Sequence, residues 1–189
     1  MIPLVWLLAQ AAPSPAKPAA PPPPVAAAPA WTPVERASAA GGTRSVSAAA
    51  NAPGGRLVVR CDHAPDAVVS VQFIPRDPYR GFGVQPVSLR FDDGTALIDN
   101  WELLGAGAIE REERAMATLT MGIAHARRIS LRTVDHAGAP LDVSFEGPAS
   151  EAPIRRVVEA CGQVLGKVAP PSPDLAPPAD PATPPGKPS

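Results

Sequence analysis

The stretch Arg56-Leu-Val-Val-Arg-Cys-Asp62, which follows the turn residues Pro53-Gly-Gly55, is the clearest β-strand pattern in this chain of 189 residues. Side chains alternate between the two faces of a strand, so an apolar set and a polar set can be separated by counting. One face carries Leu57, Val59 and Cys61, and the other carries Arg56, Val58 and Arg60. We therefore expect a sheet with one buried face, on which Cys61 lies.

Further strands are expected on both sides of this stretch, and most of them are joined by short turns. Asp92-Asp-Gly94 is a strong hairpin signal, because Asp and Gly tolerate the positive φ of tight turns. Short turns join antiparallel neighbours, so we expect a largely antiparallel sheet. The expected strands span 67–73, 85–91, 95–103, 128–134 and 141–145, with 31–37 and 43–49 as two weak edge strands.

Two segments have the spacing of helices. Over Ile109–Ala126 the apolar period changes to a helical one after the charged turn Glu110-Arg-Glu-Glu113, although a strand over 117–121 is an alternative. A second helix begins near Ser150, the expected N-cap, with Pro153 in its first turn. Its apolar stripe is Ile154, Val157, Val158, Cys161 and Leu165.

The chain has two cysteines, Cys61 and Cys161, which lie 100 positions apart. A disulfide between them would stabilise the domain by roughly 4–5 kcal/mol in the chain-entropy model. Neither belongs to a CxxC motif or has zinc-type histidine spacing, and a catalytic thiol is a weaker alternative. The predicted fold class is α+β: a small, mainly antiparallel β-sheet with one or two helices packed on one face, the C-terminal helix clamped by the disulfide.

Proline separates the terminal segments from one globular domain. Nine of the 27 prolines lie in residues 1–30 and nine in 168–189. We therefore expect a single α+β domain over 31–167, a disordered Pro/Ala-rich linker over 13–30 and a disordered Pro-rich tail over 168–189. The apolar stretch Ile2–Leu8, with Ala9 and Ala11 after it, predicts a signal peptide in residues 1–12, and hence a periplasmic or secreted protein. It lacks a basic n-region, so an apolar segment without a targeting role is the alternative.

Charge and motifs exclude several classes of function. The formal net charge of −1 argues against a nucleic-acid footprint, and no apolar run is long enough for a stable membrane span. The three histidines, His63, His125 and His136, form no HExxH motif, and no GxSxG elbow is present. We expect no cofactor, no metal and no catalytic residue.

Arginine is the most suggestive feature for binding, because 14 of the 17 basic residues are arginine. Arg60, Arg90 and Arg132 each occupy an expected strand on the side opposite its apolar face. If the strands are neighbours, their guanidinium groups would line one surface able to bind an anionic envelope polymer or an envelope protein. Genome composition, or pairing with acids such as Asp99, is the alternative explanation. Trp101 is either a core anchor or an exposed stacking residue of that surface.

The order of several short motifs resembles the VasI/TagO-type domain, a periplasmic domain associated with some type VI secretion loci. The motifs include Leu57-Val-Val-Arg-Cys61, Leu89-Arg-Phe-Asp-Asp-Gly94, Trp101 and Val157-Val-Glu-Ala-Cys-Gly162. The resemblance implies an accessory protein of the envelope, or a related exported protein, and does not by itself imply type VI secretion for this chain.

The function expected from the sequence is therefore an exported, non-enzymatic binding or accessory module of the bacterial cell envelope. An envelope hydrolase, or an inhibitor of one, is the alternative, and it requires a cleft with convergent polar groups. A structural or cytosolic protein with two free thiols is a third.

Overall fold

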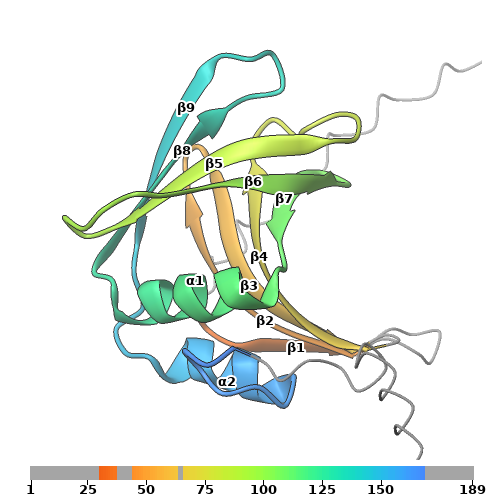
Figure 1. Ribbon diagram of the computed structural model, residues 1–189, viewed down its shortest axis with the longest axis vertical. Helices are drawn as coiled ribbons and strands as arrows, with labels where there is room; N and C mark the ends of the chain where they lie inside the picture. The colour runs from red at the N-terminus through yellow and green to blue at the C-terminus, as the bar shows by residue number, and fades with distance from the viewer. Residues whose placement is uncertain (1–29, 38–43, 64–65, 169–189) are drawn as a thin grey trace, which may run out of the picture.

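The structure is a computed structural model that describes residues 30–37, 44–63 and 66–168. These residues form an antiparallel sheet of nine strands and two helices (Figure 1). The predicted signal peptide, residues 13–29 of the linker predicted over 13–30, and residues 169–189 of the tail predicted over 168–189 lie outside the described residues. The elements are β1 Val34–Ala37, β2 Arg44–Ala52, β3 Gly55–His63, β4 Ala67–Pro75, β5 Val84–Phe91, β6 Leu97–Leu104, β7 Gly107–Glu110, α1 Glu113–His125, β8 Arg128–Val134, β9 Pro140–Glu146 and α2 Ala152–Ala160.

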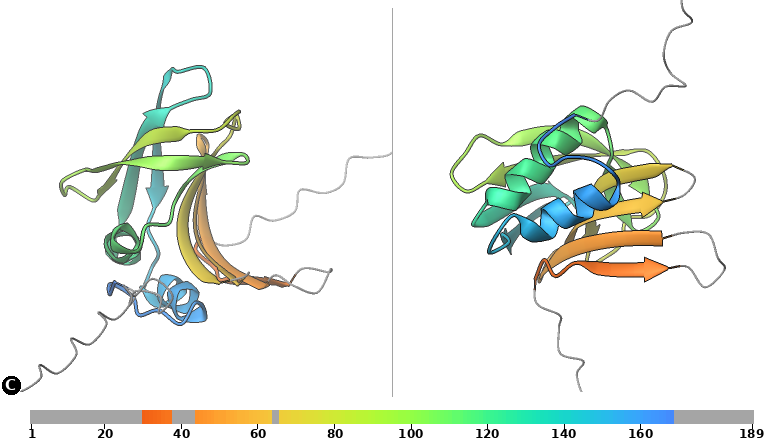
Figure 2. Two further views of the ribbon diagram at one scale, coloured as in Figure 1. Left: turned by 45° about the vertical axis from the view of Figure 1, so that its right-hand side comes forward. Right: turned by 90° about the horizontal axis from the view of Figure 1, so that it is seen from below.

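The strand order is β1-β2-β3-β4-β7-β6-β5-β8-β9, and every paired neighbour is antiparallel. The sheet is strongly curved, so that β9 returns toward β2 and the two helices lie across one end of the concave side (Figures 1 and 2). This arrangement gives the sheet an inner face, which is covered, and an outer face. The predicted α+β fold class is confirmed.

Direct pairing places the apolar residues of successive strands on the inner face. Cys61 of β3 lies between Val46 of β2 and Val69 of β4, and Phe73 of β4 lies opposite Ala108 of β7. The largest fully buried side chains are Trp31, Trp101, Phe73, Phe145, Leu57, Leu89, Ile123, Ile129, Leu131, Ile154, Val59 and Val71. The burial predicted for Leu57, Val59 and Cys61 of β3 is therefore confirmed, although Val58 on the opposite face is also buried.

Both helices bury one stripe of side chains. Helix α1 buries Leu119 and Ile123, and its start is capped by the Glu112 side chain, which accepts a hydrogen bond of 2.8 Å from the backbone N–H of Ala115. Helix α2 buries Ile154, Val157 and Val158 and packs against β2, β3 and α1. Neither helix has the length and apolar character needed to cross a bilayer, among the residues that the structure describes.

Two predictions about strands are wrong. Residues 43–49 were expected at a sheet edge, but β2 pairs with β1 on one side and β3 on the other, because its small apolar residues match the inner face of β3. The segment Gly107–Glu110 was assigned partly to a helix, but it is β7, which pairs with β4 and β6. Four residues are too few for a strand period to stand out beside the helical pattern that follows.

The limits of the two helices also differ from the prediction. Helix α1 starts at Glu113 rather than near Ile109, and the alternative strand over 117–121 is excluded. The N-cap of α2 is Glu151 rather than Ser150, and its side chain makes no capping hydrogen bond. That carboxylate instead pairs with Arg155. Leu165 lies beyond the end of α2, although it still packs against the core.

Candidate functional site

Arg90 and Arg132 lie close together on the outer face, because β5 pairs with β8. Two rows of side chains cross β5, β8 and β9 in register. The rows are Ser88–Arg132–Asp142 and Arg90–Ser130–Ser144. They line a shallow groove of about 320 Å³, which we call the outer groove. Two guanidinium groups, three hydroxyls and one carboxylate thus converge on one surface.

The two arginines of the outer groove differ in their partners. Arg132 Nε donates a hydrogen bond of 2.7 Å to Asp142 Oδ1, and this contact raises the pKa of the already basic guanidinium. Arg90 is exposed and has no ion-pair partner within residues 30–37, 44–63 and 66–168. Both arginines are charged at any physiological pH, and Asp142 offsets one of them. Arg90 is therefore the cation in the outer groove that is available to a ligand.

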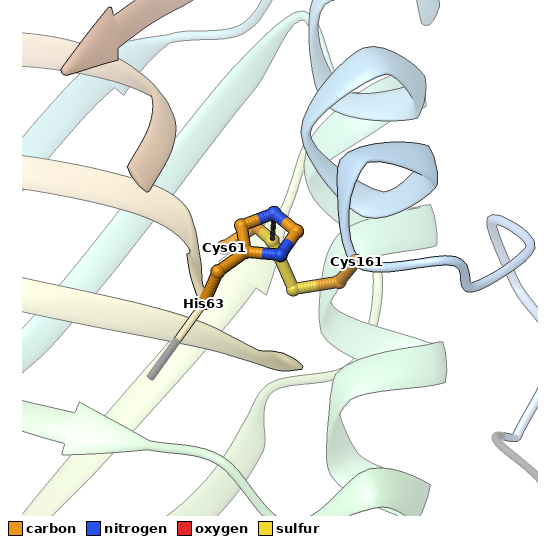
Figure 3. A group of neighbouring side chains, drawn as sticks. All are labelled: Cys61, His63 and Cys161. Atoms are coloured by element: carbon orange, nitrogen blue, oxygen red, sulfur yellow. Dashed lines mark hydrogen bonds between the residues drawn. A yellow bond between two sulfur atoms is a disulfide. The ribbon is translucent and has the colours of Figure 1, made fainter. Parts of the chain in front are cut away.

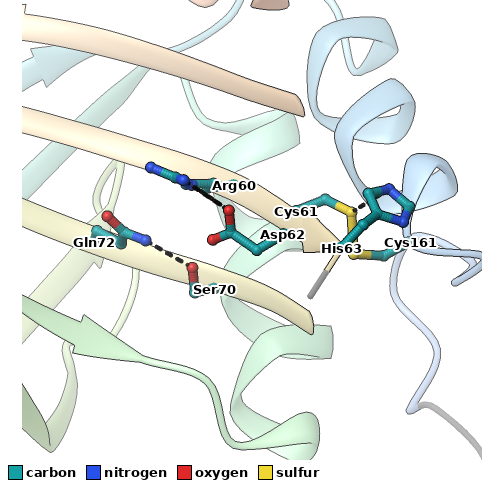
Figure 4. A network of polar contacts seen from close by, with 7 residues as sticks. All are labelled: Arg60, Cys61, Asp62, His63, Ser70, Gln72 and Cys161. Atoms are coloured by element: carbon teal, nitrogen blue, oxygen red, sulfur yellow. Dashed lines mark hydrogen bonds and ion pairs between the residues drawn. A yellow bond between two sulfur atoms is a disulfide. The ribbon is translucent and has the colours of Figure 1, made fainter. Parts of the chain in front are cut away.

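Arg60 does not join this surface, which corrects the expectation of three neighbouring arginines. It lies on β3, and β4, β7 and β6 separate that strand from β5. Its guanidinium is held by Asp62, with Nε and Nη2 at 2.8 and 2.7 Å from Oδ1 (Figure 4). On the adjacent strand β4, Gln72 donates a hydrogen bond of 2.9 Å to Ser70 (Figure 4). The polar groups around Arg60 are thus paired with one another.

Trp101 is a core residue and not part of a binding surface. Its side chain is 1 % exposed, and the pairing of β5 with β6 places it opposite Gln85 on the inner face. Of the two alternatives for this residue, the core anchor is the one that the structure supports.

The two cysteines form the predicted disulfide, which joins β3 to the C-terminal end of α2 with the Cα atoms 5.7 Å apart. The His63 ring lies over this bond, with Nε2 3.3 Å from Cys61 Sγ (Figure 3). Sequence reasoning missed His63 by placing it in a turn. A strand one residue longer puts it on the same face as Cys61, two positions away.

Among the residues that the structure describes, Cys61, His63 and Cys161 form a group of possible metal ligands. Their ligand atoms lie within 4.8 Å of one another. Metal ions bind thiolates, however, and a disulfide has no thiolate to offer. With the disulfide formed, the group is a covalent clamp rather than a metal centre.

A second hollow adjoins the outer groove at Ser144 and is lined also by Asp92 and His125. Asp92 is committed to structure, because its Oδ1 accepts hydrogen bonds of 2.9 Å from the backbone N–H groups of Arg127 and Arg128. His125 Nδ1 lies 3.1 Å from the carbonyl oxygen of Met121, and its Nε2 lies 3.6 Å from Glu151 Oε2. Both ring nitrogens of His125 therefore have partners on the helices.

In comparisons with known proteins, no family model, no curated protein and no solved structure matches the chain. The resemblance to the VasI/TagO-type domain therefore stays a prediction from the motifs.

Proposed function

We propose that the protein is an exported, non-enzymatic binding or accessory module of the bacterial cell envelope, which recognises an anionic partner through the outer groove. The observation that carries this proposal is the position of Arg90, a guanidinium without an ion-pair partner in the described part of the chain, beside Arg132 and three serines. The ligand is a carboxylate or phosphate group of an envelope polymer or of an envelope protein.

The chemistry of the groove suits such a ligand. A guanidinium donates two parallel hydrogen bonds to one carboxylate or phosphate, and these charge-assisted bonds are stronger than neutral ones. Ser130 and Ser144 lie in the same row as Arg90 and can donate hydroxyl hydrogen bonds to the remaining oxygens. Asp142 holds Arg132 in place, so less side-chain freedom is lost when a ligand binds.

Export is supported by two observations of different kinds. The disulfide is compatible with an oxidising compartment, such as the periplasm or the exterior. The apolar stretch at the start of the sequence has the spacing of a signal peptide. The motif resemblance adds support for an accessory role in the envelope, without assigning the chain to type VI secretion.

The test is binding to anionic polymers of known chemistry, such as poly-glutamate and polyphosphate, with neutral dextran as the reference ligand. Calorimetry should give a dissociation constant for an anionic polymer that rises about tenfold or more in Arg90→Ala, since a hydrogen bond to a charged group contributes about 1.5–3 kcal/mol. Arg56→Ala is the matched control, because Arg56 is also an exposed arginine on the outer face, on the distant strand β3. Equal loss in both variants, or no binding by the native protein, would contradict the proposal.

A further inference from the structure

The loop between β4 and β5 presents a phenylalanine to solvent. Phe82 is 94 % exposed and stands between Gly81 and Gly83, whose φ angles are +100° and +125°. A Cβ atom built on either glycine would meet no atom within 4 Å, so the tip of the loop projects away from the described part of the protein. In Figure 1 this yellow-green loop lies on the side of the sheet away from α1 and α2.

The base of this loop is fixed by hydrogen bonds to three other parts of the fold. The backbone N–H of Arg76 donates to the carbonyl of Gly54 at 3.1 Å, and that of Leu103 donates to the carbonyl of Gly83 at 2.8 Å. Between them, the buried Tyr79 donates its hydroxyl to the carbonyl of Val134 at 3.0 Å. Phe82 is therefore held in its exposed position by an anchored loop.

Two other exposed apolar residues lie close to Phe82 along the backbone. Val84 is the first residue of β5, and Leu104 follows Leu103, whose backbone N–H donates to the carbonyl of Gly83 at 2.8 Å. Leu104 is 49 % exposed and Val84 is 64 % exposed. Together Phe82, Val84 and Leu104 form what we call the apolar tip. Clustered exposed apolar residues mark sites of interaction with proteins or membranes.

The loop also carries two cations, Arg76 at its base and Arg80 two residues before Phe82. Arg76 and Arg80 are exposed, and neither has an ion-pair partner among the described residues. Asp77 is the acidic residue of this loop, so the segment 76–83 has a net charge of +1. Glu102, which lies opposite Val84, is neutralised by Arg111 at 2.6 Å. The loop therefore carries a small excess of positive charge, and the acidic residue opposite Val84 is paired.

We propose that this loop docks the protein onto the surface of a membrane rich in anionic lipids. An anchored, protruding aromatic residue can enter the interfacial region between the lipid headgroups and the acyl chains. A protein partner, in contrast, would have to supply a matching pocket. Arg76 and Arg80 would meet the lipid phosphates at that depth. No membrane span is needed for such an attachment.

This surface is distinct from the outer groove and does not depend on the ligand proposed for it. Val84 and Arg90 lie six residues apart on β5, which corresponds to about 20 Å along a strand. A protein docked by the apolar tip would keep the outer groove free for another component of the envelope.

The test is co-sedimentation of the full chain with large unilamellar vesicles, made either of phosphatidylglycerol and phosphatidylcholine or of phosphatidylcholine alone. We expect binding to the anionic vesicles that weakens as salt is added, because surface charges are screened. The partition coefficient should fall about tenfold in Phe82→Ser, from the lost burial of the ring. It should fall about fivefold for each arginine removed by Arg76→Ser and Arg80→Ser.

Matched controls separate the contribution of the loop to vesicle binding from that of any exposed apolar side chain and from that of any exposed cation. Ile98→Ser removes an apolar residue that is 76 % exposed on the same face but on another part of β6. The double variant Arg114→Ser/Arg156→Ser removes two exposed cations from the helices. All variants keep the same N-terminal segment, so any contribution of that segment to vesicle binding is common to them. A thermal melt of each variant checks that it is folded.

Selective loss of anionic-vesicle binding in the loop variants, with both controls unchanged, supports the proposal. Three results would overturn it: no binding of the native chain to anionic vesicles, equal loss in the loop and control variants, or equal binding to neutral and anionic vesicles. The native protein could also fail to bind vesicles while Phe82→Ser abolishes binding to a partner protein. That result would assign the apolar tip to protein recognition and would also overturn the proposal.

Discussion

The indole Nε1–H of Trp31 donates a hydrogen bond of 2.7 Å to the backbone carbonyl of Glu146, across 115 positions of sequence. The backbone N–H of Trp31 donates at 2.7 Å to the carbonyl of Ala49 on β2. Trp31 therefore bridges β2 and β9, two strands that the strand order places far apart but that the curvature brings together (Figure 2). One buried residue thus contributes two hydrogen bonds to the closure of the sheet.

Replacing Trp31 should test this closure directly. Trp31→Phe keeps an aromatic ring but leaves the Glu146 carbonyl without its indole partner, and we expect the free energy of unfolding to fall by about 1–3 kcal/mol beyond the loss of ring volume. Urea denaturation measures the change. Trp101→Phe is the matched control, because Trp101 is equally buried and its indole makes no hydrogen bond within the described residues. Equal effects of the two replacements would show that the Trp31 hydrogen bond contributes nothing.

The disulfide should contribute a large part of the stability. In the double variant Cys61→Ala/Cys161→Ala, the unfolded chain gains the freedom of a loop of about 100 residues. We expect the free energy of unfolding to fall by about 2–5 kcal/mol. Urea denaturation of the double variant measures this change. The same measurement on native protein treated with a thiol reductant should give a similar fall in the free energy of unfolding. Two thiols that react with an alkylating reagent in protein taken from its host would contradict the disulfide itself.

Gly122 of α1 is required by close packing rather than by backbone conformation. A Cβ atom there would overlap the ring of Phe91 on β5. Alanine ordinarily stabilises a helix interior relative to glycine by about 1 kcal/mol. Here we expect the opposite sign, a fall of about 1–3 kcal/mol in the free energy of unfolding of Gly122→Ala, because of overpacking.

A double-mutant cycle tests that explanation, with Phe91→Leu as the partner replacement. The smaller side chain should remove most of the cost of Gly122→Ala, so the two changes should be strongly non-additive. Additive effects, measured by urea denaturation of the four proteins, would rule out the contact between Gly122 and Phe91 as the cause.

Tyr79 should make the stability depend on alkaline pH. Burial, as the largest cause, raises the pKa of Tyr79 above its ordinary value, and the hydrogen bond with Thr133 lowers it in part. A folded-state pKa above the unfolded value of about 10 means that the phenolate is disfavoured in the native state. The stabilising contribution of Tyr79 to the free energy of unfolding is therefore fully present below about pH 10, and it is lost as the pH rises through the folded-state pKa.

The chain has one tyrosine, so its phenolate absorbance reports on Tyr79 alone. We expect an absorbance midpoint above pH 10 in the native protein, and a lower midpoint in denaturant. Tyr79→Phe should abolish the absorbance change and weaken the fall in stability above pH 10. A native midpoint at or below the denatured one would contradict the assigned effect of burial.

Much of the secondary structure was predictable because it depends on local alternation. β3, β4 and β5 were found from their period of two, and the Asp92-Asp-Gly94 turn marked the β5–β6 hairpin. β7 was missed because its four residues depend on pairing with β4 and β6 rather than on a pattern of their own.

The candidate site was predictable only in part. The outward position of Arg90 and Arg132 followed from the apolar residues that alternate with them. Their proximity required the pairing of β5 with β8, and the same strand order separates Arg60 from both. His63 was assigned to a turn, and only the longer β3 of the structure brings it over the disulfide.

The sequence by itself determined which residues could alternate in strands, which segments could form helices and which two cysteines could pair, because these depend on spacing and count. The tertiary structure decided the strand order, the closure through Trp31 and the exposure of each apolar residue. Trp101 in the middle of β6 is buried and Phe82 in the β4–β5 loop is exposed, although both are aromatic residues. The affinity of a side chain for water is a local property, but its burial depends on which distant elements the folded chain places over it.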